Sequence, residues 1–396
     1  MIRTLIAAGL FALGGMALHL GGMRAAADDQ VVVPAEEVSC QGSDRDLLDR
    51  MAGQMIMVGF LGDDEKDKGV AALRDQLAKG VVGGVVLYPE NIRSPKQVKA
   101  LIASLRDAQP DLVPLIGVDQ EGGTVQRLRQ RNGHRQFPSA RNVGRDKRYT
   151  EPGGALNVYR AMAKELADAG FNLNFGPVLD LNLNPSNPII GRRQRSYGTD
   201  PERVATLARA FILAHRQANV VPVAKHFPGH GSSRADSHKT LPDVSKTWRE
   251  IELEPYRILI RDNMLDAVML GHLYHPRFSD GERVPASLSR RTTAALRNRH
   301  WLGFRGVVFS DDMEMAGVAH HYSIEERVIK AINAGTDVIV FSNVKGRDFE
   351  LGARLHAIIV EAVCDGRISL ARIEQAYGRV RSLKRRLMRK DLTGKW

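Results

Sequence analysis

Residues 220–238 read VVPVAKHFPGHGSSRADSH, an apolar run followed by a segment dense in polar side chains. The three valines of 220–224 are typical of a buried strand. A lysine, an aspartate and three histidines follow the run. Proline and glycine interrupt the backbone at 228–231, so this second part cannot be a core strand. We interpret the stretch as a strand that ends in a functional site, where Asp236 and His238 are placed to act as a pair.

The same pattern of an apolar run followed by polar residues recurs along the chain, and helix-length segments separate the runs. The eight runs are 54–60, 81–88, 112–118, 173–179, 220–224, 267–270, 306–309 and 337–341. This alternation predicts parallel strands covered by helices. Eight is the strand number of a (β/α)₈ barrel, so we predict an α/β fold with a single TIM-type barrel.

Polar or titratable residues follow nearly every run, and they include Asp63, Glu90, Asp119, Asp180, Lys225, His272, Asp311 and Asn343. The carboxyl ends of barrel strands meet at one face, where such enzymes build their active sites. Asp311 directly follows a buried run, and a carboxylate there needs hydrogen-bond donors or a chemical role. We expect a nucleophile or electrostatic stabiliser; the alternative is a helix cap or structural ion pair. Asp312 fits a cap better, because we expect 313–316 to be helical.

The segment 225–238 holds the second candidate group. A carboxylate such as Asp236 can fix the tautomer of His238 and raise its basicity, which would make a general acid/base; the alternative is a solvated surface histidine. The glycines and serines predict a mobile arm over 227–234. A His-x3-His spacing across Phe-Pro-Gly cannot lie on one helical face. We therefore expect no metal and no other cofactor.

The segment 119–123 suggests a strand end that turns sharply. Asp119 could accept hydrogen bonds from sugar hydroxyls; the alternative is ordinary turn chemistry. Arg127, Arg195 and Lys225 could donate to the same ligand, although each alone is more often a surface charge. Lys225 is the exception, because it ends an apolar run and should point into the barrel mouth.

The N-terminus has the layout of a secretory signal peptide: a basic start, an apolar run over 5–20 and small residues at 25–27. We predict cleavage after Ala27. The alternative, an uncleaved membrane anchor, is disfavoured because the run contains His19 and several glycines. We expect a signal peptide at 1–27, a lead-in at 28–43 and one catalytic domain at 44–396. The protein should be exported, periplasmic or secreted, without stable membrane insertion.

The formal net charge is +12, and part of the excess lies in 379–390. Val380, Leu383 and Leu387 have helical spacing there, which predicts a terminal helix with one packed face. No nucleic-acid-binding module is recognisable, so we expect no nucleic-acid partner. Separately, we expect the protein to be a monomer. Cys40 and Cys364 could form a disulfide in an exported chain, but their distance apart is open.

Together these segments resemble the bacterial β-N-acetylglucosaminidases of glycoside hydrolase family 3. The resemblance rests on residues 53–60, 119–127, 225–231 joined to 236–238, and 310–312. It implies a retaining mechanism in which Asp311 is the nucleophile and His238, assisted by Asp236, is the acid/base. Residues implied to hold the terminal N-acetylglucosamine are Asp119, Arg127, Arg195, Lys225 and His226.

The expected activity is exo-acting removal of non-reducing terminal N-acetylglucosamine from muropeptides or chito-oligosaccharides. Ser232, Thr124 and Tyr197 depart from the residues common in the family, which leaves fine specificity open. Two alternatives remain. A histidine acid/base would not repel phosphate, so the enzyme could be a phosphorylase. The barrel could also be a non-catalytic cell-wall-binding protein.

Overall fold

The computed structural model describes residues 40–108, 112–151, 153–344 and 348–393. The eight predicted runs form a closed parallel barrel in the order β1-β10-β9-β8-β7-β6-β3-β2. The prediction of a (β/α)₈ TIM-type barrel is confirmed. The strands are β1 (Ile56–Gly59), β2 (Gly84–Val86), β3 (Leu115–Val118), β6 (Leu173–Asn174), β7 (Val221–Phe227), β8 (Ala267–Leu270), β9 (Val307–Asp312) and β10 (Val338–Phe341). The predicted signal peptide and most of the lead-in lie outside the described residues.

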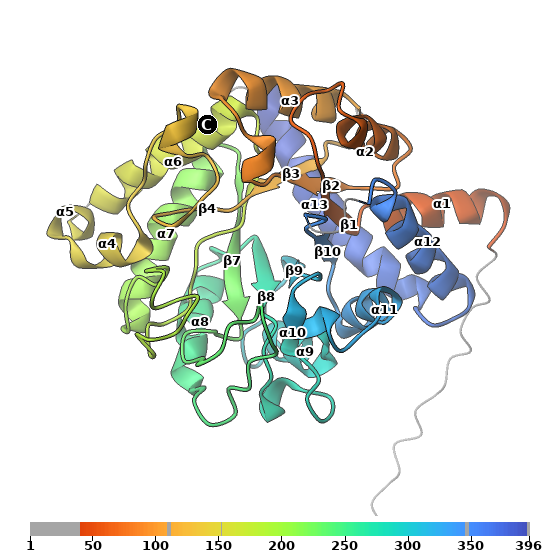
Figure 1. The fold of residues 1–396 in the computed structure, drawn as a ribbon. Coiled ribbons are helices and arrows are strands. Elements are labelled where there is room, and N and C mark those ends of the chain that lie inside the picture. Colours follow the sequence, from red (N-terminus) through yellow and green to blue (C-terminus); the bar gives the residue numbers. More distant parts are fainter. Residues whose placement is uncertain (1–39, 109–111, 152, 345–347, 394–396) are drawn as a thin grey trace, which may run out of the picture. The chain divides into compact units, whose positions relative to one another are not determined.

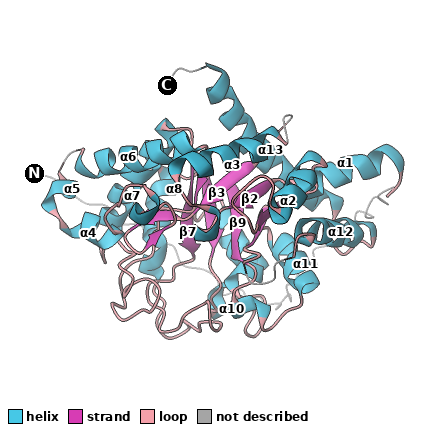
Figure 2. Ribbon diagram, turned by 45° about the horizontal axis from the view of Figure 1, so that its top comes forward, coloured by secondary structure: helices cyan, strands magenta, loops and turns pink. Residues whose placement is uncertain are grey.

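Helices surround the strands on the outside of the barrel (Figures 1 and 2). Their ends follow local rules: Ser94 caps one helix, and Ser323 with Glu326 forms a capping box at another. The helices are α1 (Gly42–Gly53), α2 (Lys68–Ala78), α3 (Pro95–Asp107), α4 (Ala140–Arg145), α5 (Lys147–Thr150), α6 (Gly154–Ala169), α7 (Pro201–Gln217), α8 (Glu254–Arg261), α9 (Arg290–Arg297), α10 (Ala316–Ala319), α11 (Ile324–Ala334), α12 (Leu351–Cys364) and α13 (Leu370–Thr393). Among these described helices, none is both long and apolar enough to cross a bilayer.

The barrel interior is packed with apolar side chains. Met57, Phe175, Met269 and Phe309 belong to this inner cluster, and Phe175 meets Phe309 edge to face. The inner cluster includes Val380, Leu383 and Leu387 of α13, so the predicted packed face of the terminal helix is confirmed. Burial of these side chains from water is the main stabilising contribution to the barrel.

A lysine within α13 is fully buried beside these apolar residues. The ammonium of Lys384 donates to the side-chain oxygen of Gln54 and to the carbonyl of Gly83, each at 2.6 Å. Burial lowers the pKa of Lys384 to about 7. The two acceptors compensate the lost hydration and join α13 to the chain around β1 and β2.

The strand β7 is longer than the sequence predicts. It continues through Phe227, which pairs with Leu270 of β8 and accepts the N–H of Gly271. We predicted a mobile arm over 227–234, and this was wrong for most of the segment, because residues 227–233 are buried. The chain becomes exposed only at Arg234.

Two further local predictions can be compared with the structure. The sharp turn expected at 119–123 is present, because β4 (Gln120–Gly122) and β5 (Val125–Gln126) form an antiparallel hairpin with Gly122 and Gly123 at positive φ. The helix expected at 313–316 was wrong, since β9 reaches Asp312 and α10 begins at Ala316. Asp312 accepts the backbone N–H groups of Glu314 and Ser342 instead of capping a helix. These two hydrogen bonds hold the turn after β9 next to the end of β10.

The two cysteines form a disulfide, which resolves the alternative that the sequence leaves open. Cys40 is bonded to Cys364 at the end of α12, with a Cα–Cα distance of 5.9 Å. The bond joins positions 324 residues apart. It links the segment before α1 covalently to the end of α12, one of the helices outside the barrel.

We predict that the variant C40S/C364S unfolds a few °C lower than the wild type, because a long cross-link typically contributes about 2–4 kcal/mol. Differential scanning fluorimetry with and without reductant measures the difference. Reductant should lower the midpoint of the wild type and leave that of the double variant unchanged. Equal midpoints for both proteins under oxidising conditions would contradict a stabilising disulfide.

Candidate active site

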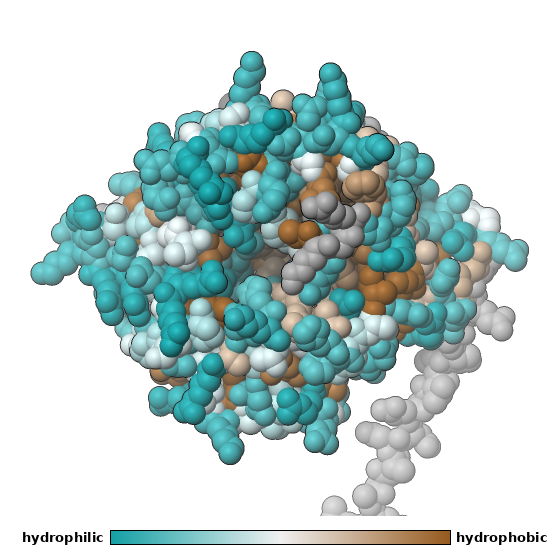
Figure 3. Space-filling model, in the orientation of Figure 1, coloured by the Kyte–Doolittle hydropathy of each residue, from teal (hydrophilic) through white to brown (hydrophobic). Residues whose placement is uncertain are grey.

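The carboxyl ends of the strands open into a cavity of about 580 Å³. In the space-filling view a hollow lies near the middle of a largely hydrophilic face (Figure 3). All eight predicted site residues line this cavity: Asp119, Arg127, Arg195, Lys225, His226, Asp236, His238 and Asp311. They come from distant parts of the chain and meet because parallel strands of a barrel end at one rim.

A buried network of opposite charges forms one wall of the cavity. The ammonium of Lys225 lies 2.6 Å from Asp119 Oδ1 and 2.7 Å from Glu121 Oε1. Arg195 pairs with Glu121 through two hydrogen bonds of 2.8 Å each. Burial opposes ionisation of both carboxyl groups, yet the adjacent cations hold the pKa of Asp119 and that of Glu121 below their ordinary values. Both carboxylates are therefore ionised near neutral pH.

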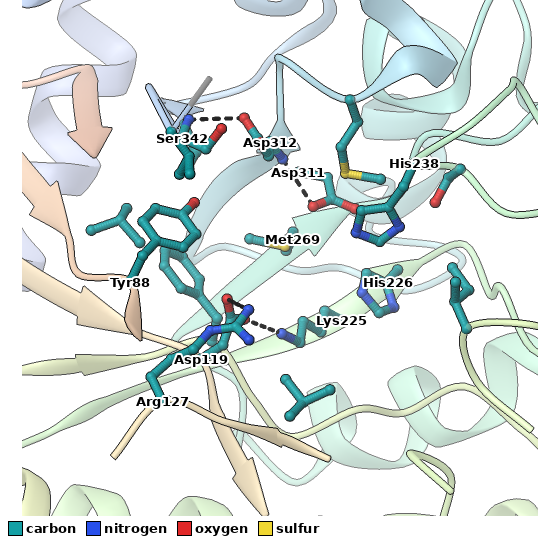
Figure 4. A pocket seen from close by; sticks show the side chains of 18 of the residues that line it. Tyr88, Asp119, Arg127, Lys225, His226, His238, Met269, Asp311, Asp312 and Ser342 are labelled. Carbon is teal, nitrogen blue, oxygen red and sulfur yellow. Dashed lines mark hydrogen bonds and ion pairs between the residues drawn. The ribbon is translucent and has the colours of Figure 1, made fainter. Parts of the chain in front are cut away.

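Asp119 also receives a hydrogen bond of 3.1 Å from the Arg127 guanidinium. Figure 4 shows Asp119, Arg127 and Lys225 together on one side of the cavity. The Asp119 and Arg127 side chains remain about one-fifth exposed, whereas that of Lys225 is almost fully buried. The carboxylate offers acceptors and the two cations offer donors, a combination that suits the recognition of neighbouring hydroxyl groups.

His226 is oriented by a carboxylate beneath it. Asp180 Oδ2 lies 2.6 Å from His226 Nδ1, and Arg195 lies 3.3 Å from the other ring nitrogen, Nε2. Asp180 is fully buried, and despite that burial the imidazole of His226 holds the pKa of Asp180 below its ordinary value. These contacts place the proton on Nδ1 and leave Nε2 as an acceptor in the neutral ring.

Asp311 occupies the end of β9, and one of its oxygens accepts the N–H of Asp312 at 2.9 Å. Burial opposes ionisation, but the nearby imidazoles of His272 and His226 hold the pKa of Asp311 below its ordinary value. The neighbouring Asp312 behaves oppositely, because burial raises its pKa to about 6. Two adjacent carboxyl groups thus differ in proton affinity, and Asp311 is the one with the lowered pKa, which suits a nucleophile that must be ionised.

The Asp236–His238 pair forms as predicted. Asp236 Oδ1 lies 2.9 Å from both the backbone nitrogen and the Nδ1 atom of His238. Burial opposes ionisation of Asp236, but these two contacts lower its pKa. The His238 side chain is 60 % exposed, and Figure 4 shows it on the same side of the cavity as Asp311. With Nδ1–H donated to Asp236, Nε2 is free to exchange a proton with a ligand.

Three residues were not assigned a role by the sequence. Glu121 was hidden within an expected turn, although its place two residues after Asp119 could have suggested a shared face of a strand. Asp180 and His272 were recognised only as polar strand ends. The ring of His272 contacts Ser287 Oγ at 2.7 Å and the carbonyl of Asp312 at 2.9 Å, next to the candidate nucleophile.

A family model described as the glycosyl hydrolase family 3 N-terminal domain matches residues 47–383. The chain belongs to glycosyl hydrolase family 3. It is 40 % identical to a beta-hexosaminidase of Tolumonas auensis over 280 residues, which are 68 % of this chain and 78 % of that protein. A Pseudomonas aeruginosa beta-hexosaminidase is 39 % identical over 265 residues, covering 66 % and 75 % of the two chains. The resemblance inferred from the motifs is confirmed, and the protein is a glycoside hydrolase.

Solved structures agree with the barrel. A beta-N-acetylglucosaminidase from a Paenibacillus species matches with a TM-score of 0.77 and 35 % identity, covering 86 % of this chain and 62 % of the other. A beta-N-acetylhexosaminidase from Beutenbergia cavernae matches with a TM-score of 0.75 and 30 % identity, covering 85 % and 98 %. The chain thus spans less than two-thirds of the first protein and nearly all of the second.

We predict that Glu121→Gln destabilises the protein and weakens substrate binding. The substitution leaves two buried cations with one carboxylate fewer, and breaking such a pair typically costs about 3–5 kcal/mol. Thermal unfolding should occur at a lower temperature, and KM for an aryl N-acetyl-β-glucosaminide should rise. The control is Asp75→Asn, which removes an exposed pair with Lys79 and should change neither quantity. An unchanged midpoint and KM in Glu121→Gln would refute the importance of the network.

Proposed function

We propose that this family 3 hydrolase is an exo-acting, retaining β-N-acetylglucosaminidase. One observation carries the proposal: the ionised Asp311 and the Asp236–His238 pair line the same cavity as a cluster suited to sugar hydroxyls. The names of the relatives, beta-hexosaminidase and beta-N-acetylglucosaminidase, support the same activity. The substrate sugar is a terminal, non-reducing N-acetylglucosamine.

In this proposal the charged wall holds the sugar. Asp119 accepts hydrogen bonds from ring hydroxyls, while Arg127 and Lys225 donate to them. Arg195 and His226 complete the wall and are held by Glu121 and Asp180. Because these side chains are already paired and wholly or mostly buried before substrate binds, little conformational entropy is lost on binding.

The chemistry then proceeds in two steps. Protonated His238 gives its Nε2 proton to the glycosidic oxygen as the carboxylate of Asp311 attacks the anomeric carbon, so the C–O bond to the leaving group breaks and a glycosyl ester forms. Neutral His238 next takes a proton from water, whose oxygen attacks the anomeric carbon and releases Asp311. Both transition states have oxocarbenium character, which the negative charge of Asp311 stabilises.

We further propose that the enzyme acts outside the cytoplasm, as a monomer, on peptidoglycan fragments or chito-oligosaccharides. The disulfide between Cys40 and Cys364 supports an oxidising compartment. The signal-like sequence at 1–27 supports export. Both substrate classes present terminal N-acetylglucosamine in such compartments.

Asp311→Asn should lower kcat on an aryl N-acetyl-β-glucosaminide by at least about 10³-fold, because the variant lacks the nucleophile. A 5-fluoro glycosyl inactivator should add its sugar mass to the wild-type peptide that contains Asp311, as measured by mass spectrometry. The same treatment should leave Asp311→Asn unlabelled. Asp168→Asn on the exposed face of α6 is the control and should behave as the wild type. A label on another residue would overturn the assignment.

The two alternative functions are tested in the same assay. Added phosphate should produce no sugar 1-phosphate and no gain in rate; either result would indicate a phosphorylase. A wild-type protein that binds chito-oligosaccharides and muropeptides without releasing sugar over hours would instead be a non-catalytic binding protein.

A further inference from the structure

A buried glutamate lies beneath the segment that carries the acid/base pair. Glu252 belongs to the short 3₁₀ helix η3 (Glu250–Leu253), and only 1 % of the residue is exposed. Its Oε2 atom lies 3.0 Å from the backbone nitrogen of Gly231, which donates to it. Glu252 is not among the side chains that line the cavity, so a direct role in substrate binding does not account for its burial.

Two glycines of the segment lie where no side chain would fit, and one of them packs against Glu252. Gly229 has a φ of +120°, and a Cβ atom there would lie 2.7 Å from the Cβ of Glu252. A Cβ on Gly231 would lie 1.7 Å from the carbonyl oxygen of Leu181. The backbone therefore passes through a gap that admits only glycine, and Glu252 forms one wall of that gap.

Hydrogen bonds continue from this gap to the acid/base pair. The backbone N–H of His230, adjacent to Gly231, donates to Asp180 at 2.8 Å. The His230 ring nitrogen Nε2 lies 3.3 Å from Ser237 Oγ, and the Ser237 carbonyl accepts the N–H of Gly317 at 3.1 Å. Ser237 is buried and stands between Asp236 and His238 in the chain. A shift at Gly231 would therefore be transmitted to both neighbours of Ser237.

We propose that Glu252 is a positioning residue for proton transfer: it holds Gly231, and through His230 and Ser237 it keeps His238 aimed into the cavity. This inference rests on the proposed function, because it requires His238 to be the acid/base. Glu252 touches neither the substrate nor the reacting atoms. It acts only through the backbone that it anchors.

The chemical form of Glu252 suits this role. Burial and the negative charge of Asp180 raise the pKa of Glu252 to about 7. Near pH 7, Glu252 is then neutral in a substantial fraction of the molecules. A neutral carboxyl group can accept the hydrogen bond from Gly231 and can also donate one through its own O–H. A glutamine has the same shape and the same two capabilities. Glu252→Gln should therefore retain the anchor, whereas Glu252→Ala removes it.

The test compares kcat/KM for two substrates that differ only in their leaving group, a 2,4-dinitrophenyl and a 4-methylphenyl N-acetyl-β-glucosaminide. Dinitrophenolate leaves without protonation, but the methylphenyl ether oxygen needs the acid. In Glu252→Ala, kcat/KM should fall about 10-fold or more for the methylphenyl substrate and less than about 3-fold for the dinitrophenyl substrate. The larger loss is only part of the roughly 10²–10⁴-fold rate gain that a general acid supplies, because His238 itself is still present. Glu252→Gln should restore the wild-type ratio.

Three further variants make the result interpretable. Glu250→Ala, two residues away on the same turn, removes an exposed partner of Arg277 and should keep the wild-type ratio. His238→Ala removes the acid itself, so its losses in kcat/KM on the two substrates give the largest difference to be expected. If Glu252→Ala does not fold, Glu252→Asp retracts the carboxyl group by one methylene and should show a smaller loss of the same kind.

The outcomes separate the inference from the proposed function. An equal loss on both substrates in Glu252→Ala, or no loss, overturns the positioning role, while a leaving-group-dependent loss in His238→Ala upholds the acid/base assignment. If His238→Ala shows no such dependence, the acid/base assignment fails and the role of Glu252 fails with it. Circular dichroism of each variant excludes an effect of the folded fraction.

Discussion

The ammonium of Lys225, placed between the carboxylates of Asp119 and Glu121 in the buried rim of the barrel, is the interaction on which the site depends. Charges in this setting are expensive to desolvate, and each is tolerable only beside an opposite charge. Since Lys225 belongs to β7 and Asp119 follows β3, the ion pairs also bring together segments more than a hundred residues apart. The wall that should recognise the sugar is thus assembled by the same contacts that stabilise the rim.

The two proposed reacting groups lie in contrasting environments. Asp311 sits at the end of β9, where its position is set by the barrel and its charge by neighbouring imidazoles. His238 is exposed and belongs to a segment outside the strands, so its position depends on the anchors at Asp180, Glu252 and Ser237. A nucleophile needs a fixed approach to one carbon, whereas an acid/base must give and later recover a proton. In the proposed function, the end of β9 carries the first group and a hydrogen-bonded segment carries the second.

Much of this architecture could be predicted because apolar runs and the residues after them are local signals. The eight strands follow from that pattern, as does the convergence of Asp119, Lys225 and Asp311 at one rim, whereas the resemblance to the family supplied the sugar-binding roles of Arg127, Arg195 and His226. Predictions failed where a partner distant in the chain decides the conformation. Phe227 remains in a strand because β8 pairs with it, and Asp312 faces a turn because the N–H of Ser342 reaches it from the end of β10. Pro228 and Gly229 suggested that the strand ends before Phe227, but hydrogen bonds to β8 outweighed that local preference.

By itself, the sequence determined the barrel, the face that carries the site, and the identity of the Asp311 and Asp236–His238 candidates, because strand periodicity and residue type are encoded locally. Only the tertiary structure decided the partners. It showed that Glu121 shares Lys225 with Asp119, that Asp180 orients His226, that Glu252 supports Gly231, and that Cys40 meets Cys364. The physical reason is that pairing and desolvation depend on distances of a few ångströms between residues remote in sequence, and these distances exist only after the chain has folded.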